Sequence, residues 1–365
     1  MELTPEQVAS EDAGYWVFLK RIQLQRSIFT YTDHEYQKEP MQNTCKRSCY
    51  MKATRGGFSE IEILKSLHGM IYGRYKEGVL YLFPTTDDVN EFSKARFNPL
   101  ILANKQAIGR YVKSGGRGTD TTSLKKIHNA FLYLRGARLS EKRGDESEST
   151  KMKSIGVDKI VFDEVDHMED EVIAKARGRY YDSPHQEEVF IGNPIVPDFG
   201  VDKQWAKSDQ RHWWRKCLHC GKYTCAELFF LEDQERCVGT RQNGTGYIAC
   251  KNCGREVFIR DGEWQPSLKE NTSYMKGYRW SQLTSAVCDP LDILHDFRDP
   301  PEGNLADVYR LRLGLPYIAA EDRLTQAQVY ECCNNDGMYS SHSGPCAMGV
   351  DVGKVKHIII GSRTG

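Results

Sequence analysis

A glycine-rich stretch near the start of the chain, CYMKATRGGFSE (residues 49–60), has the residue types of a phosphate-binding loop. Such loops usually read G-x-x-x-x-G-K-[ST] between a strand and a helix, with the lysine on the β- and γ-phosphates and the hydroxyl on Mg²⁺. Aligning Gly57 with the second glycine puts Ser59 at the hydroxyl position. Phe58 then stands in place of the lysine, and Lys52 in place of the first glycine. Three interpretations are open: an inactive loop, a chance pair of glycines, or a loop whose lysine has moved.

Two carboxylates further along the chain could complete a nucleotide site. Asp163 and Glu164 end the apolar run in DKIVFDEVD. An aspartate there can hold Mg²⁺, which prefers hard oxygen ligands, and the glutamate can orient and polarise the water that attacks the γ-phosphate. The alternative is a helix N-terminus, where the helix dipole favours acids. The order of loop and acidic strand favours the nucleotide site and predicts ATP hydrolysis.

The same order favours a moved lysine over a lost one. A lysine is a point charge on a flexible stem, so its origin can shift while its tip still reaches the phosphates. Lys52 is expected at the strand end beneath the loop, the amides of residues 55–59 can form an anion cradle, and the following helix would point its N-terminus at the phosphates. We therefore predict an active, rearranged loop in which Phe58 packs beside the helix that it opens.

Two pairs of cysteines, in CLHCG and CKNCG, could hold a metal ion. They are Cys217, Cys220, Cys250 and Cys253. The two-residue gap lets one turn present both thiolates to the same ion, and the following glycine allows the tight backbone of that turn. Four thiolates complete a coordination shell, so we predict structural zinc without a catalytic role. Cys225, Cys237 and His219 lack a partner at this spacing, and we expect none of them to bind the ion.

A parallel sheet would position these groups. Short apolar runs bounded by turn residues alternate with helical patterns, which is typical of a parallel sheet covered by helices. Strands are predicted at 48–53, 78–84, 130–136, 158–164 and 187–194. The segment SEIEILKSLHGMIYGRY has helical spacing, so the glycine-rich loop leads from a strand into a helix. The predicted fold class is α/β: a P-loop NTPase with a central, mostly parallel sheet flanked by helices, plus a small zinc-ribbon-like module.

Composition narrows the setting of the protein. Its 365 residues include fifty basic and fifty acidic side chains, so nucleic-acid binding would depend on local patches. No run approaches the roughly eighteen apolar residues of a membrane span, and the start of the chain lacks a signal-peptide pattern. Twelve cysteines could form disulfides in a small secreted domain, but in a long chain without that pattern metal binding in a reducing, cytoplasmic setting is favoured.

The residues around the two motifs resemble a known family. The lysine at the start of the loop, the bulky residue before the serine, GVLYLFPTTDDVNEF and IVFDEVD resemble the large terminase subunits of tailed bacteriophages, in the branch with an atypical phosphate loop. The resemblance implies an ATP-driven motor that moves viral double-stranded DNA into a procapsid, with a nuclease domain of the ribonuclease-H type after the ATPase. It also implies a ring of subunits on the portal protein, a small terminase subunit as partner, and action in the host cytoplasm.

The resemblance assigns roles to residues by position. The ATP-binding positions would be Tyr36, Gln37, Lys52, Ala53, Thr54, Arg55, Gly56, Gly57, Phe58 and Ser59. Tyr36 and Gln37 would read the adenine, Ser59 and Asp163 would hold Mg²⁺, and Glu164 would be the catalytic glutamate.

Two further pairs of residues take roles from the resemblance. Asn193 and Pro194 occupy the motif that couples hydrolysis to movement. Arg135 and Arg138 are candidates to neutralise transition-state charge, together with Lys52, and could equally form structural ion pairs.

Five segments are predicted along the chain. They are a helical, adenine-contacting segment (1–45), the ATPase core (46–204), the zinc module (205–265), a segment that completes the ATPase and serves as a linker (266–345), and the start of a nuclease domain (346–365). Asp351 takes the place of an early metal-binding aspartate of that nuclease. A two-metal nuclease needs several carboxylates from distant strands, and only fourteen residues follow Asp351, so we expect no DNA cleavage by this chain.

Two other classes of protein remain as alternatives. A helicase-like DNA-dependent ATPase would share both nucleotide motifs but needs a second, arginine-bearing domain of similar size, for which residues 200–345 leave no room. A zinc-stabilised assembly adaptor with a degenerate loop would bind nucleotide without turning it over.

Overall fold

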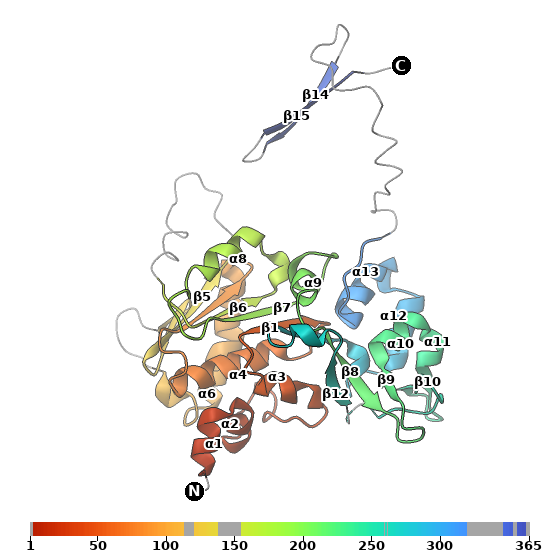
Figure 1. Cartoon of the computed structure of the whole chain (residues 1–365), viewed down its shortest axis with the longest axis horizontal. Helices are drawn as coiled ribbons and strands as arrows, with labels where there is room; N and C mark the ends of the chain where they lie inside the picture. Colours follow the sequence, from red (N-terminus) through yellow and green to blue (C-terminus); the bar gives the residue numbers. More distant parts are fainter. Residues whose placement is uncertain are drawn as a thin grey trace. The chain divides into compact units, whose positions relative to one another are not determined.

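The computed structural model describes residues 3–112, 120–137, 155–258, 260 and 262–319, and the backbone of 346–352 and 356–362. The chain divides into two compact units, Met1–Ile318 and Ala319–Gly365. The first unit is an α/β domain built on one large sheet (Figure 1). Among the described residues this sheet has eleven strands, in the order β12-β8-β13-β1-β7-β6-β2-β5-β4-β3, with β9 paired to β8.

Strand and helix bounds follow the chain order. The strands of the large sheet are β1 (Arg47–Lys52), β2 (Val79–Phe83), β3 (Asp120–Thr121), β4 (Leu124–Ile127), β5 (Ala130–Gly136), β6 (Lys159–Asp163), β7 (Glu187–Gly192), β8 (Arg211–Lys216), β9 (Tyr223–Cys225), β12 (Gly262–Pro266) and β13 (Lys276–Trp280). The helices are α1 (Pro5–Glu11), α2 (Ala13–Leu19), α3 (Lys38–Gln42), α4 (Phe58–Ile71), α5 (Thr86–Glu91), α6 (Asn98–Ala103), α8 (Asp170–Arg177), α9 (Gly200–Trp205), α10 (Ala226–Glu232), α11 (Gln234–Cys237), α12 (Pro290–Arg298) and α13 (Leu305–Asp307). Two π-helical turns lie at Phe92–Phe97 and Val308–Leu313.

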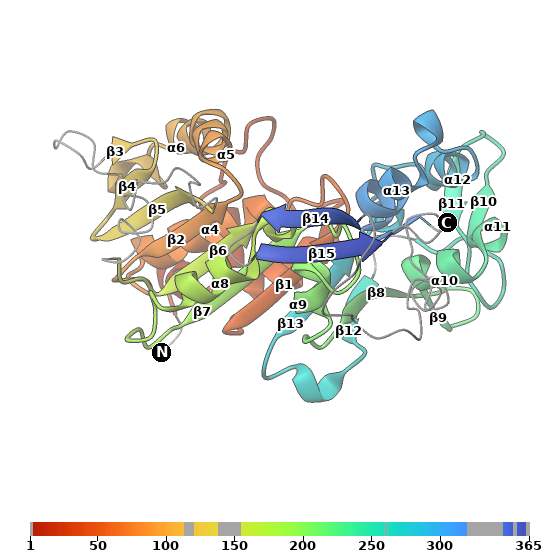
Figure 2. The same ribbon diagram turned by 90° about the horizontal axis from the view of Figure 1, so that it is seen from above.

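The five predicted strands are all present and form the parallel centre of the sheet. They correspond to β1, β2, β5, β6 and β7, and each pairs in parallel with its neighbours in the order β1-β7-β6-β2-β5. The predicted fold class is therefore confirmed: a mostly parallel sheet with helices on both faces. Because strand residues alternate between faces, Tyr50 and Tyr81 pack with α4 and the N-terminal helices, whereas Met51 and Leu80 pack with α8 and α9. Figure 1 shows α4 and the N-terminal helices on one face of the sheet and α8 and α9 on the other, and Figure 2 shows the sheet from above.

One central strand was not predicted from the sequence. β13 pairs in parallel with β1 from Ser48↔Lys276 to Lys52↔Trp280, and so extends the sheet on the far side from β7. Tyr278 and Trp280 of this strand are buried in the same core as the loop helix. Its charged residues Lys276 and Arg279 interrupt the apolar run by which buried strands are recognised, which explains the omission.

The zinc-ribbon-like region packs at the edge of the sheet. A small antiparallel pair, β10 (Val238–Thr240) and β11 (Gly246–Ile248), lies beside α10, α11 and α12. Its core joins side chains of α10 and β11 to Leu283, Ile293 and Leu313, which come from far beyond the second cysteine pair. The region therefore does not depend on metal alone for its packing.

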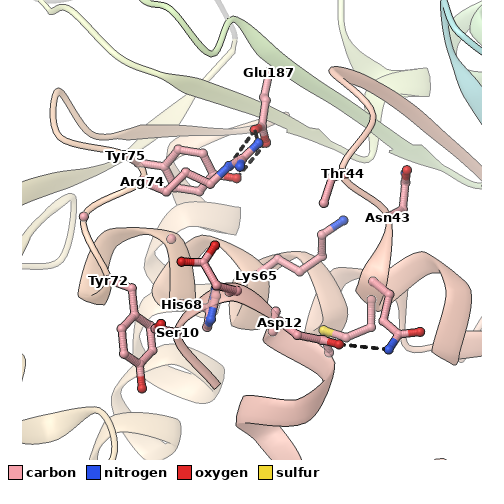
Figure 3. A pocket seen from close by; sticks show the side chains of 16 residues that line it. Ser10, Asp12, Asn43, Thr44, Lys65, His68, Tyr72, Arg74, Tyr75 and Glu187 are labelled. Atoms are coloured by element: carbon pink, nitrogen blue, oxygen red, sulfur yellow. Dashed lines mark hydrogen bonds and ion pairs between the residues drawn. The ribbon is translucent and has the colours of Figure 1, made fainter. Parts of the chain in front are cut away.

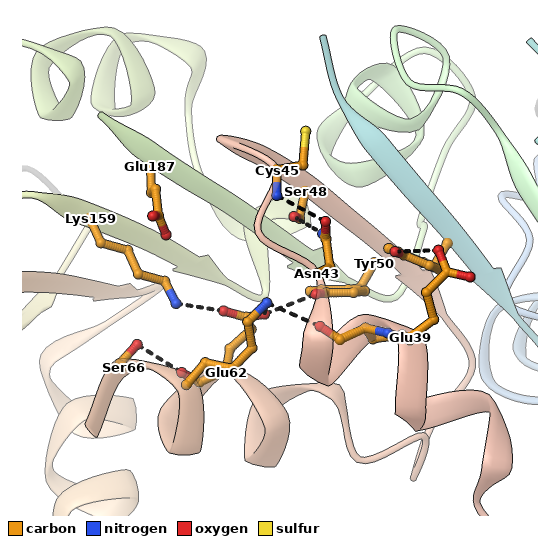
Figure 4. Close-up of polar contacts among 12 residues, drawn as sticks. Glu39, Asn43, Cys45, Ser48, Tyr50, Glu62, Ser66, Lys159 and Glu187 are labelled. Carbon is orange, nitrogen blue, oxygen red and sulfur yellow. Dashed lines mark hydrogen bonds and ion pairs between the residues drawn. The ribbon is translucent and has the colours of Figure 1, made fainter. Parts of the chain in front are cut away.

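A buried ionic cluster fastens the middle of α4 to the sheet (Figure 4). The Glu62 carboxylate lies 2.7 Å from Nζ of Lys159 on β6 and 3.0 Å from Nζ of Lys65, and it accepts a hydrogen bond from Tyr50 of β1. Burial by itself would raise the pKa of Glu62, but the two ammonium groups outweigh it and lower the pKa to about 2. Glu62 therefore stays ionised at neutral pH and balances two buried cations.

Glu62→Gln is expected to destabilise the protein by about 3 kcal/mol, because two ammonium groups would remain buried with no carboxylate between them. Chemical denaturation measures the loss. Glu171→Gln is the matched control, because Glu171 pairs with Lys175 on the exposed surface of α8, where such pairs contribute under about 0.5 kcal/mol. Equal stability of both variants would mean that the buried cluster contributes no more than a surface pair.

The second unit contains a hairpin of β14 (Cys346–Val352) and β15 (Lys356–Ser362). The two strands are antiparallel, and Asp351 lies opposite His357 in the ladder. The role of Asp351 as a nuclease metal ligand stays a prediction.

Candidate active site

The glycine-rich loop follows β1 and opens α4, as predicted. Gly57 adopts the left-handed conformation at φ 76°, and a Cβ there would lie 2.4 Å from Nε2 of Gln37, so a glycine is required. None of the described side chains caps the start of α4, which leaves its first amides available to an anion. Phe58 is fully buried and stacks on Tyr50 with ring centroids 4.9 Å apart, so it packs as the sequence predicted.

Tyr36 and Gln37 support the loop from below. The hydroxyl of Tyr36 and the side-chain amide of Gln37 both donate hydrogen bonds to the carbonyl of Gly56, at 3.2 and 2.9 Å. Both side chains are buried. These contacts fix the shape of the loop, and the adenine-reading role that the resemblance gave to the pair stays a prediction.

Lys52 is the last residue of β1, and its role as a moved lysine stays a prediction. Its ammonium donates to Oδ1 of Asn193 at 3.0 Å and is 3.6 Å from the carboxylate of Glu164. The amide of Asn193 donates back to the carbonyl of Lys52 at 2.8 Å. Three residues from β1, β6 and β7 thus meet at the carboxyl edge of the sheet, with Pro194 next in the chain.

Ser59 and Asp163 form the other half of the site. Oγ of Ser59 donates to Oδ1 of Asp163 at 3.0 Å. Burial and the neighbouring carboxylate of Glu164 raise the pKa of Asp163 to about 6, although the charge of Lys52 and the hydrogen bond from Ser59 oppose the shift. A hydroxyl and a carboxylate oxygen in this arrangement suit Mg²⁺, which takes hard oxygen ligands and keeps several waters. A cation there would also favour the ionised form of Asp163.

Glu164 adopts a strained backbone conformation beside a cavity. Its φ of 58° and ψ of 50° lie in the left-handed region, where a residue with a side chain is held only by its surroundings. The cavity has a volume of about 450 Å³ and is lined by Ser59, Phe83, Pro84, Thr85, Asp88, Glu91, Phe92, Arg96, Asp163, Glu164 and His167. The two acids of the β6 end and the serine of the loop therefore face one space.

Of the two arginines predicted to neutralise transition-state charge, the structure describes Arg135 alone. Arg135 lies on β5 and donates from Nη1 to the backbone carbonyls of Ser123 and Leu134, and the described residues around the cavity do not include it. Arg138 lies outside the described residues. The catalytic role of both stays a prediction.

Asp166 is a buried residue of the site that the sequence did not single out. Its carboxylate accepts hydrogen bonds from the amides of Ile195 and Val201, both at 3.3 Å, and Cβ atoms at Gly192 or Gly200 would collide with it. Burial raises its pKa to about 7. Asp166 ties the turn after β6 to the segment after Asn193, and the only signal in the sequence is a third acid in DEVD.

A strap formed by residues 308–317 joins the two loops of the site. The carbonyl of Leu311 accepts hydrogen bonds from the amide and hydroxyl of Thr54. Arg310 donates to the carbonyl of Ile195 at 3.0 Å, and the amide of Tyr317 donates to the same carbonyl. Ala53, between Lys52 and Thr54, donates its amide to the carbonyl of Trp280. The phosphate loop and the segment after Asn193 are thus held by a part of the chain far away in sequence.

The four predicted cysteines come together at the edge of the sheet. Sγ of Cys217 lies 3.7 Å from that of Cys253, and Sγ of Cys220 lies 3.6 Å from that of Cys250. A tetrahedral zinc ion with Zn–S bonds of about 2.3 Å separates its ligands by roughly 3.8 Å. All four sulfur atoms lie within 4.8 Å of one another, so the cluster fits such an ion.

The three residues predicted not to bind zinc have other contacts. Nδ1 of His219 is 3.1 Å from Arg255, Cys237 donates to a backbone carbonyl, and Cys225 donates to the carboxylate of Glu227. His212, Cys225 and Glu227 also cluster within 4.8 Å. The buried guanidinium of Arg279 acts electrostatically on all three, which disfavours a second cation there.

A separate cavity of about 390 Å³ lies at the amino edge of the sheet, beside the N-terminal helices (Figure 3). Arg74 and Tyr75 on its wall both contact Glu187, and Asp12 accepts from Gln42. Arg74 and Glu187 form an ion pair with each other, and we assign the cavity no ligand.

Comparison with known proteins identifies a family whose model matches this sequence. The model of the family described as phage terminase large subunit gpA, ATPase domain, matches residues 29–272. Among solved structures, the ATPase domain of the Thermus phage P74-26 large terminase is 11% identical with a TM-score of 0.43, over 75% of this chain and 90% of that chain. The large terminase of the thermophilic bacteriophage D6E in complex with ADP is 12% identical with a TM-score of 0.40, over 78% and 52%. No curated protein matches the sequence.

Proposed function

Because that family match spans more than half of the chain, the protein belongs to the large terminase subunits of phages and carries their ATPase domain, and we propose that it hydrolyses ATP to move viral double-stranded DNA into a procapsid. The observation that carries the proposal is the meeting of Lys52, Asp163 and Glu164 at one edge of the sheet. A degenerate loop that does not support hydrolysis would not require these three residues to lie together.

Each residue of the site has a proposed task in hydrolysis. The ammonium of Lys52 binds the β- and γ-phosphates from beneath the loop, and the first amides of α4 hold their oxygens. Ser59 and Asp163 would hold Mg²⁺, which supplies charge neutralisation across the phosphates when bound. Glu164 accepts a hydrogen bond from water and takes its proton as the water oxygen bonds to the γ-phosphorus. The bond from the γ-phosphorus to the bridging oxygen breaks, and its electron pair stays on ADP.

Asn193 supports the proposal that hydrolysis is coupled to movement. It holds both the ammonium and the carbonyl of Lys52, so phosphates that draw the ammonium away would release one of its two contacts. We propose that Pro194, the next residue, then moves together with the strap, which hydrogen-bonds to the carbonyl of Ile195.

The cysteine cluster supports one structural zinc ion. Cys217→Ser is expected to lower bound zinc from one per chain to near zero and to loosen the two cysteine-bearing turns, because the metal joins them. The helices and strands that pack on Leu283, Ile293 and Leu313 should stay folded. Elemental analysis and limited proteolysis measure both effects. Cys225→Ser is the control, a buried thiol of the same module that should keep the ion. Wild-type protein purified without chelator and free of zinc would refute the assignment.

Family membership extends the proposal to partners. We propose double-stranded DNA, the portal protein, a small terminase subunit and further copies of this chain in a ring, acting in the host cytoplasm. None of the described helices is long and apolar enough to cross a membrane.

Phosphate release with and without double-stranded DNA tests the central proposal. We expect hydrolysis that DNA stimulates. Bound ATP without turnover would favour the assembly adaptor, and separation of the strands of a forked duplex would favour a helicase.

A further inference from the structure

We propose that Arg96 is a catalytic residue that contacts the γ-phosphate from the wall of the cavity that Ser59, Asp163 and Glu164 also line, an inference that rests on the proposed ATPase function. Arg96 lies in the π-helical turn Phe92–Phe97 after α5. Such turns recur at functional sites because they re-aim side chains within a helix.

The position of Arg96 points to the nucleotide. It lines the same cavity as Ser59, Asp163 and Glu164, and its charge acts on the Asp163 carboxylate. Among the described residues of the cavity wall it carries the only lysine or arginine side chain. Lys52 approaches the site from the β1 end, whereas Arg96 approaches from the segment after β2.

The cavity wall is rich in negative charge, which the guanidinium of Arg96 partly offsets. Four carboxylates line the wall, those of Asp88, Glu91, Asp163 and Glu164. Asp88 is engaged in capping α5 through Thr85, but the remaining acids would repel a triphosphate. A single cation on the same wall therefore has a large effect on whether charge can develop at the γ-phosphate.

The contacts of Arg96 do not explain it as a structural residue. It forms an ion pair with Glu60, with Nη1 and Oε1 3.9 Å apart, and both side chains are more than one third exposed. Ion pairs of this kind contribute little to stability. Arg96 is thus held loosely enough to turn toward a ligand.

The proposed contact assists the step already described. As water bonds to the γ-phosphorus and the bond to the bridging oxygen breaks, negative charge builds on the phosphoryl oxygens. Arg96 would donate hydrogen bonds to a non-bridging oxygen and keep its proton throughout, while the proton of the water passes to Glu164.

The test compares Arg96→Ala and Arg96→Lys with wild type in steady-state hydrolysis and in binding of a fluorescent ATP analogue. We expect kcat to fall about a hundredfold in Arg96→Ala, the cost of one lost transition-state donor, with a much smaller change in nucleotide affinity. Arg96→Lys should recover only part of the rate, because an ammonium lacks the planar fork of donors. Added guanidinium ion at low, non-denaturing concentration should partly restore Arg96→Ala.

Two controls separate this role from a structural one. Lys94→Ala removes an exposed basic residue of the same turn and should hydrolyse ATP at the wild-type rate. Glu60→Gln removes the partner of Arg96 while leaving its charge, and its rate should fall much less than that of Arg96→Ala. A wild-type rate in Arg96→Ala would overturn the inference while leaving the proposed function intact. A loss of rate in Glu60→Gln equal to that in Arg96→Ala would show that the ion pair, and not the guanidinium, matters. Inactive wild-type protein would overturn the proposed function itself.

Discussion

Lys52→Ala is expected to abolish ATP hydrolysis, with a loss of about a thousandfold, and to weaken ATP binding. The substitution removes the ammonium that lies beneath the phosphate loop and contacts both Asn193 and Glu164, and a lost donor to developing charge costs about 10²–10³ in rate. Asn193 would also lose the partner that orients its side chain. Phosphate release and nucleotide binding, measured on the same preparation, separate the two effects.

Lys46→Ala is the matched control for Lys52, because Lys46 is an exposed lysine just before the same strand. It should hydrolyse ATP normally. Phe58→Lys, which would restore the usual loop motif, is not a useful rescue: Phe58 is fully buried against Tyr50, so an ammonium there would be desolvated and would destabilise the loop. Normal hydrolysis by Lys52→Ala would end the moved-lysine hypothesis.

Glu164→Gln should lower turnover by about 10²–10⁴-fold while ATP binding remains nearly intact. The amide keeps the size of the side chain but cannot take a proton from water, and general bases contribute that range of rate. It would also no longer attract the Lys52 ammonium electrostatically, so affinity for a triphosphate should not fall. Single-turnover hydrolysis and binding of the fluorescent analogue measure the two quantities.

Glu169→Gln provides the comparison for Glu164, since it changes an exposed glutamate a few residues along the same turn. Its rate should equal that of wild type. If Glu164→Gln bound ATP tightly and turned it over at an undiminished rate, the proton acceptor would have to be another group facing the cavity.

The sequence predicted the parts of the site that depend on local patterns. The strands that lead to the loop and to Asp163 have apolar centres at residues 49–51 and 160–162, and parallel strands end at the same edge, so their terminal residues had to meet. The cysteine pairs were equally clear, because two knuckles of fixed spacing can serve one ion. In each case a few neighbouring residues contain the whole signal.

The remaining parts depend on contacts that no local pattern records. Arg96 became a candidate only when a π-helical turn placed it on the cavity wall, and a single arginine in SKARFNP carries no motif. Asp166 acquires its role from two glycines in another segment, which leave room for its carboxylate. β13 was hidden because two of its five residues are charged.

The strap has a consequence for how the protein is made. Thr54 hydrogen-bonds to a residue 257 positions later in the chain, and β13, the neighbour of β1, also comes from the last part of the first unit. Since chains emerge from the ribosome with the N-terminus first, the phosphate loop is synthesised early but obtains its backbone partners only when residues 276–317 have been released. A nascent chain arrested before that point should not retain ATP. Energy use by this subunit would therefore begin only after the zinc module, which lies between the two halves of the site in sequence, has been synthesised.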